Sequence, residues 1–300
     1  MEITFWGVRG SYPIARPDNT RYGGNSTCIH FRTLGGEEWI FDGGSGIFPL
    51  GRSLMQREFG RGEGFARIMI GHTHWDHILG FPYFEPFYVP GNRFEIYSAG
   101  QAGADIEHIL VGQQHDDNFP VPFKAFRAAI RFYTLQPDDS LELGGTQVRT
   151  LQLNHPGITL GYRIETSGVA GSAAVIYTDT ARIDAVRLGD GMNDSDAFAR
   201  DFKARMLEHV SGADLLVHDA HFSEEEIAGK EHWGHSTPND AARLAVEAGV
   251  KRVAMFHHAP EHSDDVVDEL LAEARKIGGD QVEIFGAEEG ESLVTGGLGG

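Results

Sequence analysis

The sequence predicts an α/β fold in which short strands begin the chain and return after its middle, with helices between them. Apolar, β-favouring segments such as residues 65–70 predict strands, whereas an acidic amphipathic segment at residues 264–276 predicts a helix. Several of the strand-like segments run directly into side chains that can bind metal ions. No repeat, linker or shift in composition marks a boundary, so we expect a single domain over residues 1–300.

The first part of the chain predicts short strands separated by turns rich in glycine and proline. These strands are expected at residues 3–8, 28–33, 38–42, 65–70 and 93–98. A helix over residues 50–59 is closed by Gly60, and another helix is expected to open at residues 78–81. Residues 82–130 predict an irregular insertion, which we place near the mouth of a site.

The second part of the chain repeats the pattern of short strands with helices between them. Strands are expected at residues 131–135, 141–143, 146–153, 161–164, 174–177, 214–217, 253–256 and 282–285, and helices at residues 197–209, 223–228, 239–248 and 264–276. Ser236 or Thr237 can cap the helix at residue 239, with Pro238 early in its first turn. The glycine-rich tail 296–300 is expected to be frayed.

Composition narrows the classes of partner. The formal net charge of −19 makes the surface poorly suited to long nucleic acid, which is bound by neutralising phosphates with Lys and Arg, but a small anionic substrate remains compatible with it. A single cysteine, Cys28, excludes an internal disulfide and suits a reducing cytosol. The N-terminal residues predict a strand and no stretch has the apolar length of a membrane span, so we expect a cytoplasmic protein without membrane contact.

The strongest chemical signal is the segment 72–77, with the sequence His-Thr-His-Trp-Asp-His, directly after the strand 65–70. A helix would spread these side chains around its circumference, whereas a tight loop after a strand can aim them into one two-metal site. Imidazoles with one carboxylate suit zinc, with manganese or iron as alternatives. A histidine-rich surface loop is the plainer alternative, and four ligand-type side chains within six residues favour the metal site.

The His-x-His-x-Asp-His pattern after a strand resembles the signature of the metallo-β-lactamase superfamily of hydrolases. This resemblance implies a four-layer αββα sandwich, in which two mixed sheets lie between helices. It also implies two metal ions, the first held by His72, His74 and His155 and the second by Asp76, His77 and a late histidine, with Asp179 bridging. His155 and Asp179 also follow predicted strands, which agrees with this assignment.

The resemblance extends to two further positions. The late histidine is His257 or His258. The resemblance favours His257, because in related phosphodiesterases the ligand is the first polar residue after the apolar strand. Asp42, which follows a strand and precedes two glycines, matches a superfamily aspartate that supports the metal loop from behind.

Two further segments resemble one branch, the tRNA 3′-end processing endonucleases and their phosphodiesterase relatives. They are residues 214–220, Asp-Leu-Leu-Val-His-Asp-Ala, and residues 234–237, Gly-His-Ser-Thr. The resemblance implies that Asp219 and His235 form a catalytic pair beside the metals, with Asp76 as a further catalytic residue. Asp219 stands where glutamate is usual, and the plainer alternative for His235 is a helix cap. The sequence leaves the roles of Arg9, His115 and His221 open, with a phosphate contact or a structural turn for Arg9 and a substrate contact or a solvated side chain for His115.

The sequence therefore predicts a dinuclear-metal phosphodiesterase that acts on a small phosphodiester, such as a cyclic nucleotide, through attack by a metal-bridging hydroxide. A tRNA-processing role is disfavoured because we find no basic, Gly/Pro-rich arm and the net charge opposes it. The sequence is also compatible with a thioesterase or lactonase of the same fold, or with a non-hydrolytic ligand sensor. Many relatives pair, so the resemblance is compatible with a homodimer.

Overall fold

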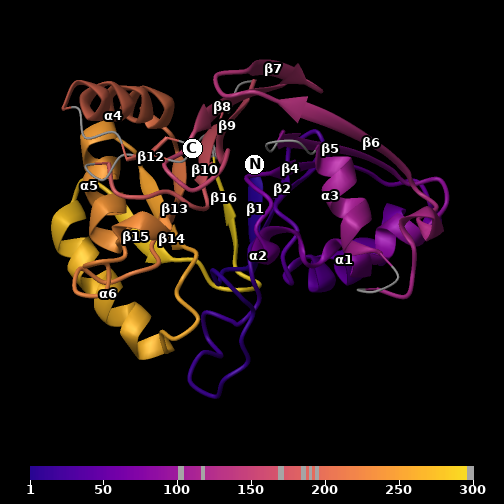
Figure 1. Ribbon diagram of the computed structural model, residues 1–300, viewed down its shortest axis with the longest axis horizontal. Coiled ribbons are helices and arrows are strands. Elements are labelled where there is room, and N and C mark those ends of the chain that lie inside the picture. The colour runs from indigo at the N-terminus through magenta and orange to yellow at the C-terminus, as the bar shows by residue number, and fades with distance from the viewer. Residues whose placement is uncertain are drawn as a thin grey trace.

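The computed structural model describes residues 1–100, 105–115, 119–167, 172–183, 187–188, 191–192 and 196–295. Their main strands form two seven-stranded sheets (Figure 1). In Figure 1, helices α4, α5 and α6 lie on one side of the sheets, and α1 and α3 lie on the other. This layered arrangement confirms the predicted αββα fold.

The first sheet has the strand order β16-β1-β2-β3-β4-β5-β6. Its strands are β1 (Glu2–Gly7), β2 (Cys28–Arg32), β3 (Glu38–Phe41), β4 (Phe65–Ile70), β5 (Arg93–Ala99), β6 (Ala129–Leu135) and β16 (Ser292–Val294). Strands β3 to β6 are parallel, whereas β1 pairs antiparallel with both β2 and β16. The chain thus returns to its beginning, where the Met1 amino group donates a hydrogen bond to the Thr295 carbonyl at 2.9 Å. The helices that follow these strands are α1 (Ile47–Met55), α2 (Trp75–Ile78) and α3 (Ile106–Gln113).

The second sheet has the strand order β15-β14-β13-β10-β9-β8-β7, with β10, β13, β14 and β15 parallel. Its strands are β7 (Ser140–Leu143), β8 (Thr146–Gln152), β9 (Leu160–Thr166), β10 (Ser172–Tyr177), β13 (Leu215–Asp219), β14 (Arg252–Phe256) and β15 (Glu283–Gly286). Its helices are α4 (Asp196–Val210), α5 (Pro238–Ala248) and α6 (Asp264–Gly278), and a small ribbon joins β11 (Arg187–Leu188) to β12 (Gly191–Met192).

Three apolar clusters fill the spaces between these layers. One lies between the sheets and contains residues of both, such as Phe41 from β3 and Phe256 from β14. A second lies under α1 and α3 and is rich in phenylalanine from residues 81–94. The third lies between the second sheet and α4, α5 and α6. The central parallel strand β4 is covered on both faces, so five of its six residues are buried and, apart from Arg67, they are apolar without alternation.

Some helix boundaries differ from those predicted. The helix expected to open at residues 78–81 instead ends at Ile78, because Asp76 and His77 already belong to the four-residue helix α2. His74 has extended backbone angles and begins the helix, and Asp76 in its first turn suits the positive end of the helix dipole. One helical turn is too short to spread the ligands, so the motif combines loop and helix.

The remaining predicted segments agree with the structure in one helix and differ from it in another. Residues 223–228 form turns and no helix, although Ser223 and Glu226 bond each other's backbone N–H groups as in a capping box, so the expected helix does not continue past its first turn. Helix α5 begins as expected, with Thr237 and Asp240 in a reciprocal capping box and Pro238 in the first turn. The tail 296–300 lies outside the described residues. Within the described part of the chain, no helix combines the length and the apolar character that crossing a membrane would require.

Candidate metal centre

The ends of strands from both sheets bring the predicted site residues together. His72 follows β4, Asp179 follows β10, Asp219 ends β13, and His257 follows β14. His155 follows β8 on the side of the second sheet that is nearest to the loop after β4. A crevice at the carboxyl ends of parallel strands is the usual place for a site in an α/β fold.

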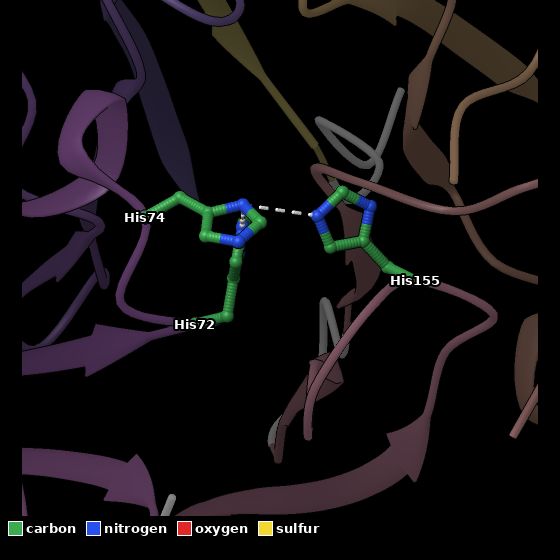
Figure 2. A group of neighbouring side chains, drawn as sticks. All are labelled: His72, His74 and His155. Atoms are coloured by element: carbon green, nitrogen blue, oxygen red, sulfur yellow. Dashed lines mark hydrogen bonds between the residues drawn. The ribbon is translucent and has the colours of Figure 1, made fainter. Parts of the chain in front are cut away.

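Three imidazoles form the first half of the cluster. The His74 Nδ1 atom lies 2.8 Å from His72 Nε2 and 3.2 Å from His155 Nε2. Figure 2 shows the three rings pointing toward one another, with His72 and His74 on one segment and His155 on another. His155 Nδ1 donates a hydrogen bond to the Gly234 carbonyl at 2.9 Å, which leaves Nε2 to face the cluster. His72 and His155 are buried, and His74 is exposed, so this half is open on the His74 side.

The second half combines carboxylates and imidazoles. Asp179 Oδ2 lies 3.0 Å from His77 Nε2, and Asp179 Oδ1 lies 3.2 Å from His257 Nε2. Asp76 Oδ2 lies 3.2 Å from His77 Nε2 and 3.1 Å from His257 Nε2, and it also accepts the Ser11 N–H at 2.8 Å. His72, His77 and Asp179 can themselves share an ion, so Asp179 lies between the two halves, where a bridging ligand was predicted.

The polar atoms of this cluster suit divalent ions. His77 Nε2 and Asp179 Oδ2 are both buried and, among the described residues, neither has a hydrogen-bond partner, although they lie 3.0 Å apart. The two atoms form a buried ion pair without further partners, and they lie close enough to bind one cation together. Imidazole nitrogens and carboxylate oxygens are also the donors that zinc, manganese and iron accept. The predicted ligand set therefore fits a pair of metal ions.

Burial and charge tune the protonation of the cluster. Burial lowers the pKa of His155 to about 4, and it also lowers the pKa of His72 and His74, so the first half presents neutral rings. Burial alone would raise the pKa of Asp76 and Asp179, but the neighbouring histidines outweigh it and hold both values below the usual range. The carboxylates of the second half therefore stay ionised.

The second half is supported from behind. Asp42 Oδ2 accepts a hydrogen bond from His77 Nδ1 at 2.8 Å, and Asp42 Oδ1 accepts the Gly71 N–H at 2.8 Å. This is the supporting role that was predicted for Asp42. Among the described residues, four that are not glycine have a positive φ, and three of them, Ser11, Asp42 and His257, lie at this site. Backbone in that sparsely populated region is maintained only where the surroundings enforce it, and it concentrates at functional sites.

Beside the metal cluster lies the predicted pair of Asp219 and His235. His235 Nδ1 donates to Asp219 Oδ2 at 2.8 Å and lies 3.8 Å from Asp179 Oδ1. Aspartate in place of the usual glutamate thus reaches the imidazole. Asp219 also accepts the backbone N–H groups of Thr180, His221 and Ser236, which fix its orientation.

The structure separates the roles that the sequence left open. His257 lies in a group with Asp76 and His77 that could hold a metal ion, whereas the His258 ring lies 5.2 Å from the Tyr22 ring and its burial lowers its pKa to about 3. Arg9 is fully buried and donates to the carbonyls of residues 23, 259 and 262, so it has the structural role and not a phosphate contact. His115 is exposed after the end of α3.

Sequence reasoning left the contribution of His221 to the site open and missed that of the Ser11 backbone. The His221 ring stacks on the His235 ring with centroids 4.5 Å apart, and its Nδ1 donates to the His257 carbonyl at 3.0 Å. The two-residue spacing from Asp219 to His221, just past a strand, was a usable signal, because residues two apart face the same side. The Ser11 backbone N–H that binds Asp76 has no such signal, since every residue except proline has this donor.

Known proteins share both the sequence pattern and the fold of this chain. A family model described as a β-lactamase superfamily domain matches residues 51–258, which is more than half of the chain. The chain belongs to this superfamily. Its site is that of a metal-dependent hydrolase, as predicted, and divalent ions are the cofactors that such a site takes.

Individual relatives cover nearly the whole chain. Ribonuclease Z of Synechococcus sp. (strain CC9311) is 27% identical over 92% of this chain and 94% of its own length. The metallo-β-lactamase fold protein YhfI from Bacillus subtilis has a TM-score of 0.68 at 20% identity and covers 97% of this chain and 98% of its own. The short form of human tRNase Z has a TM-score of 0.61 at 20% identity, and the match covers 98% of this chain and 99% of the human chain. The two structures show the shared fold, and the name Ribonuclease Z runs against the expectation of no long nucleic acid partner.

Proposed function

We propose that this superfamily member is a dinuclear-metal phosphodiesterase whose substrate is a small phosphodiester, with a cyclic nucleotide as the leading example. The observation that carries this proposal is the hydrogen-bonded pair of His235 and Asp219, 3.8 Å from the central carboxylate Asp179. An oriented imidazole at this position suits an oxygen leaving group, which needs a proton as it departs.

The residues around the metals have separate tasks in this proposal. His72, His74 and His155 would hold one ion, Asp76, His77 and His257 the other, and Asp179 both, with zinc favoured by the nitrogen-rich donors. When bound, two such ions supply an activated water and polarise the phosphoryl group. Asp76 belongs to the catalytic group because the Ser11 N–H fixes its Oδ2 atom between His77 and His257.

His235 has two properties that suit the leaving-group side. Its Nδ1 proton is engaged by Asp219, so Nε2 is the nitrogen available to the substrate, either to donate a proton to the departing oxygen or to stabilise negative charge on the phosphoryl group. Asp219 fixes the orientation of the ring by accepting that hydrogen bond. We infer that the pair acts as a unit, with Asp219 as the positioning residue.

The chain is proposed to act as one domain, because the ligands come from both sheets. His72 follows β4 of the first sheet, and Asp179 and His257 follow β10 and β14 of the second. Neither sheet alone contains a complete ligand set, so separating them would abolish the site.

RNA is the second candidate substrate. It is favoured by the name of the relative from Synechococcus, which matches 92% of this chain. The net charge of −19 favours the small phosphodiester instead, because long RNA requires many compensating Lys and Arg contacts.

A hydrolysis screen of the metal-loaded protein tests the proposal. The substrates are bis(p-nitrophenyl) phosphate, 2′,3′- and 3′,5′-cyclic nucleotides, an RNA with a 3′ extension, a thioester and a lactone. We expect turnover of phosphodiesters that requires metal and falls in a His235→Ala variant with unchanged metal content. Faster cleavage of the RNA would select the second candidate, and turnover confined to the thioester or lactone would refute the proposal.

A further inference from the structure

Two exposed tryptophans lie in the segments that build the metal centre. Trp75 is 65% exposed and Trp233 is 51% exposed, although both are large apolar side chains. The other two tryptophans differ from them, since Trp39 is fully buried and Trp6 packs partly against the cluster under α1. A ring that remains in water at such positions loses the stabilisation that burial would give it, so its position calls for an explanation.

The two indoles belong to segments that are joined through the first half of the metal centre. Trp75 lies between the predicted ligands His74 and Asp76 in the chain. Trp233 precedes Gly234, whose carbonyl accepts the hydrogen bond of His155. His155 and His74 are in turn 3.2 Å apart, and His74 is the exposed member of its triad. Each indole is therefore one residue away in the chain from a group at the open first half, Trp75 from His74 and Trp233 from Gly234.

Gly234 keeps the second of these segments close to the metal centre. Its φ of +87° lies in the left-handed region, and a Cβ atom there would meet His155 Nδ1 at 2.5 Å. Only glycine allows this approach, so the position of Trp233 relative to the ligand His155 is fixed by the backbone and not by chance packing.

Neighbouring side chains hold Trp233 and add a positive charge. Its Nε1 donates to His232 Nε2 at 3.1 Å, and its ring lies 6.1 Å from the buried Phe222. Lys230 Nζ lies 4.6 Å from the centre of the Phe222 ring and 5.7 Å from that of Trp233. On a protein with a net charge of −19, this ammonium group beside Trp233 favours an anion there.

Aromatic side chains are suited to substrates that a strongly acidic surface would otherwise bind weakly. Every nucleobase has a flat π face, and stacking on an aromatic side chain strengthens binding by about 5- to 150-fold per base. Stacking is insensitive to the net charge, so it can retain an anionic nucleotide that long-range repulsion disfavours.

We propose that Trp75 and Trp233 form a stacking site for the nucleobase of a nucleotide whose phosphodiester reaches the metal centre. This inference rests on the phosphodiesterase function proposed above and narrows its substrate class from small phosphodiesters to nucleotides. Lys230 serves the phosphate, and the two indoles serve the base.

A pair of substrates that differ only in the base tests the inference. Uridine 2′,3′-cyclic phosphate carries a base, and 1-O-methylribose 2,3-cyclic phosphate does not. We expect Trp75→Ala and Trp233→Ala each to lower kcat/KM for the nucleotide by about 5- to 150-fold and to leave the methylribose analogue unchanged. Trp75→Phe and Trp233→Phe should restore most of the loss because a stacking face returns. An equal loss for both substrates, or no loss for the nucleotide, would overturn the inference.

Two controls make the comparison specific. Each variant should retain the metal content of the parent, measured by elemental analysis. Tyr133→Ala removes another exposed aromatic side chain, on β6 at the far edge of the first sheet, and should change neither substrate. A loss in Tyr133→Ala as large as that in Trp75→Ala would also overturn the assignment.

A binding experiment separates this inference from the proposed function. If the parent protein hydrolyses no phosphodiester, the function is refuted, whereas the stacking site is still tested by quenching of indole fluorescence. Adenosine monophosphate should quench and bind more tightly than ribose 5-phosphate, and the Trp75→Phe/Trp233→Phe protein should bind it without that quenching. Equal binding of the two ligands would overturn the stacking site. A dimer of the parent protein that the Trp75→Ala/Trp233→Ala substitutions convert to a monomer would also overturn it, because a second copy of the chain would then cover the indoles.

Discussion

The two halves of the metal centre are built differently. The first half, His72, His74 and His155, consists of imidazoles that are neutral near pH 7 and is open at His74. The second half, Asp76, His77 and His257 with Asp179 beside it, is buried and mixes carboxylates with imidazoles.

The surroundings differ as much as the ligands. Asp42 and the Ser11 N–H fix the second half from outside, and Ser11, Asp42 and His257 have left-handed backbone there. In the first half, the Gly234 carbonyl orients His155, and the exposed His74 has solvent beside it. We propose a division of labour, in which the second half, held rigid by these contacts, retains its ion and the open first half meets the substrate.

Removing the shared carboxylate should have the largest effect on bound metal. Asp179→Ala takes away the only group that reaches both halves in our assignment, and it leaves Asp76 as the one carboxylate of the ligand set. We expect the loss of at least one ion per chain and of all measurable turnover. Elemental analysis provides the measurement, and unchanged metal content would remove Asp179 from its bridging role.

Removing one proposed ligand of the rigid half should release the metal ion of that half and leave the other ion bound. His257→Ala is expected to lose about one ion per chain, whereas His258→Ala should lose none, because the His258 ring lies against Tyr22. The two variants are matched controls, since both residues are buried histidines at adjacent positions. A greater loss of metal from His258→Ala would reassign the ligand.

Weakening the hydrogen bond from Asp42 to the rigid half should reduce its metal affinity without abolishing metal binding. Asp42→Asn retains a residue that tolerates left-handed backbone. It replaces the carboxylate that accepts the His77 hydrogen bond with an amide. We expect metal affinity in this half to fall about 10- to 100-fold while the first half is unaffected. Competition with a metal chelator measures both affinities. An equal loss in the two halves would contradict the proposed independence of their supports.

Removing the neighbouring imidazole should leave both halves loaded. His235→Ala deletes a side chain that we place outside both ligand sets, so metal content should equal that of the parent. Hydrolysis of a diester with a poor leaving group should slow by about 10²- to 10⁴-fold, with a smaller loss for p-nitrophenolate, which departs without a proton. The ratio of the two rates is the decisive measurement. Equal reductions in rate for the two diesters would show that His235 does not protonate the leaving group.

The same contrast explains how far the sequence alone could lead. His72, His74, Asp76 and His77 lie close together in one segment, so their residue types and spacing predicted a metal site directly. His155, Asp179 and His257 were predicted from their positions after strands, together with the resemblance to a known superfamily. These assignments depend on strand ends, which apolar segments mark well.

Features that depend on three-dimensional approach were beyond that reasoning. The two possible roles of Arg9 could be separated only by its buried contacts with backbone carbonyls of residues 23, 259 and 262. The stacking of His221 on His235 depends on the direction of the chain after β13, and the Ser11 N–H is a backbone donor without a sequence signal. The start of α2 inside the motif was missed because a single turn is too short to show a helical period.

The pairing of β16 with β1 has a consequence for biosynthesis. Thr4 and Ser292, which hydrogen-bond through their hydroxyl groups, are 288 positions apart in the chain. During synthesis, the backbone amides and carbonyls on the outer edge of β1 remain unpaired until the ribosome has made β16. Such an edge invites association between nascent chains, so a chaperone that shields extended segments should raise the yield of native protein more than one that isolates finished domains.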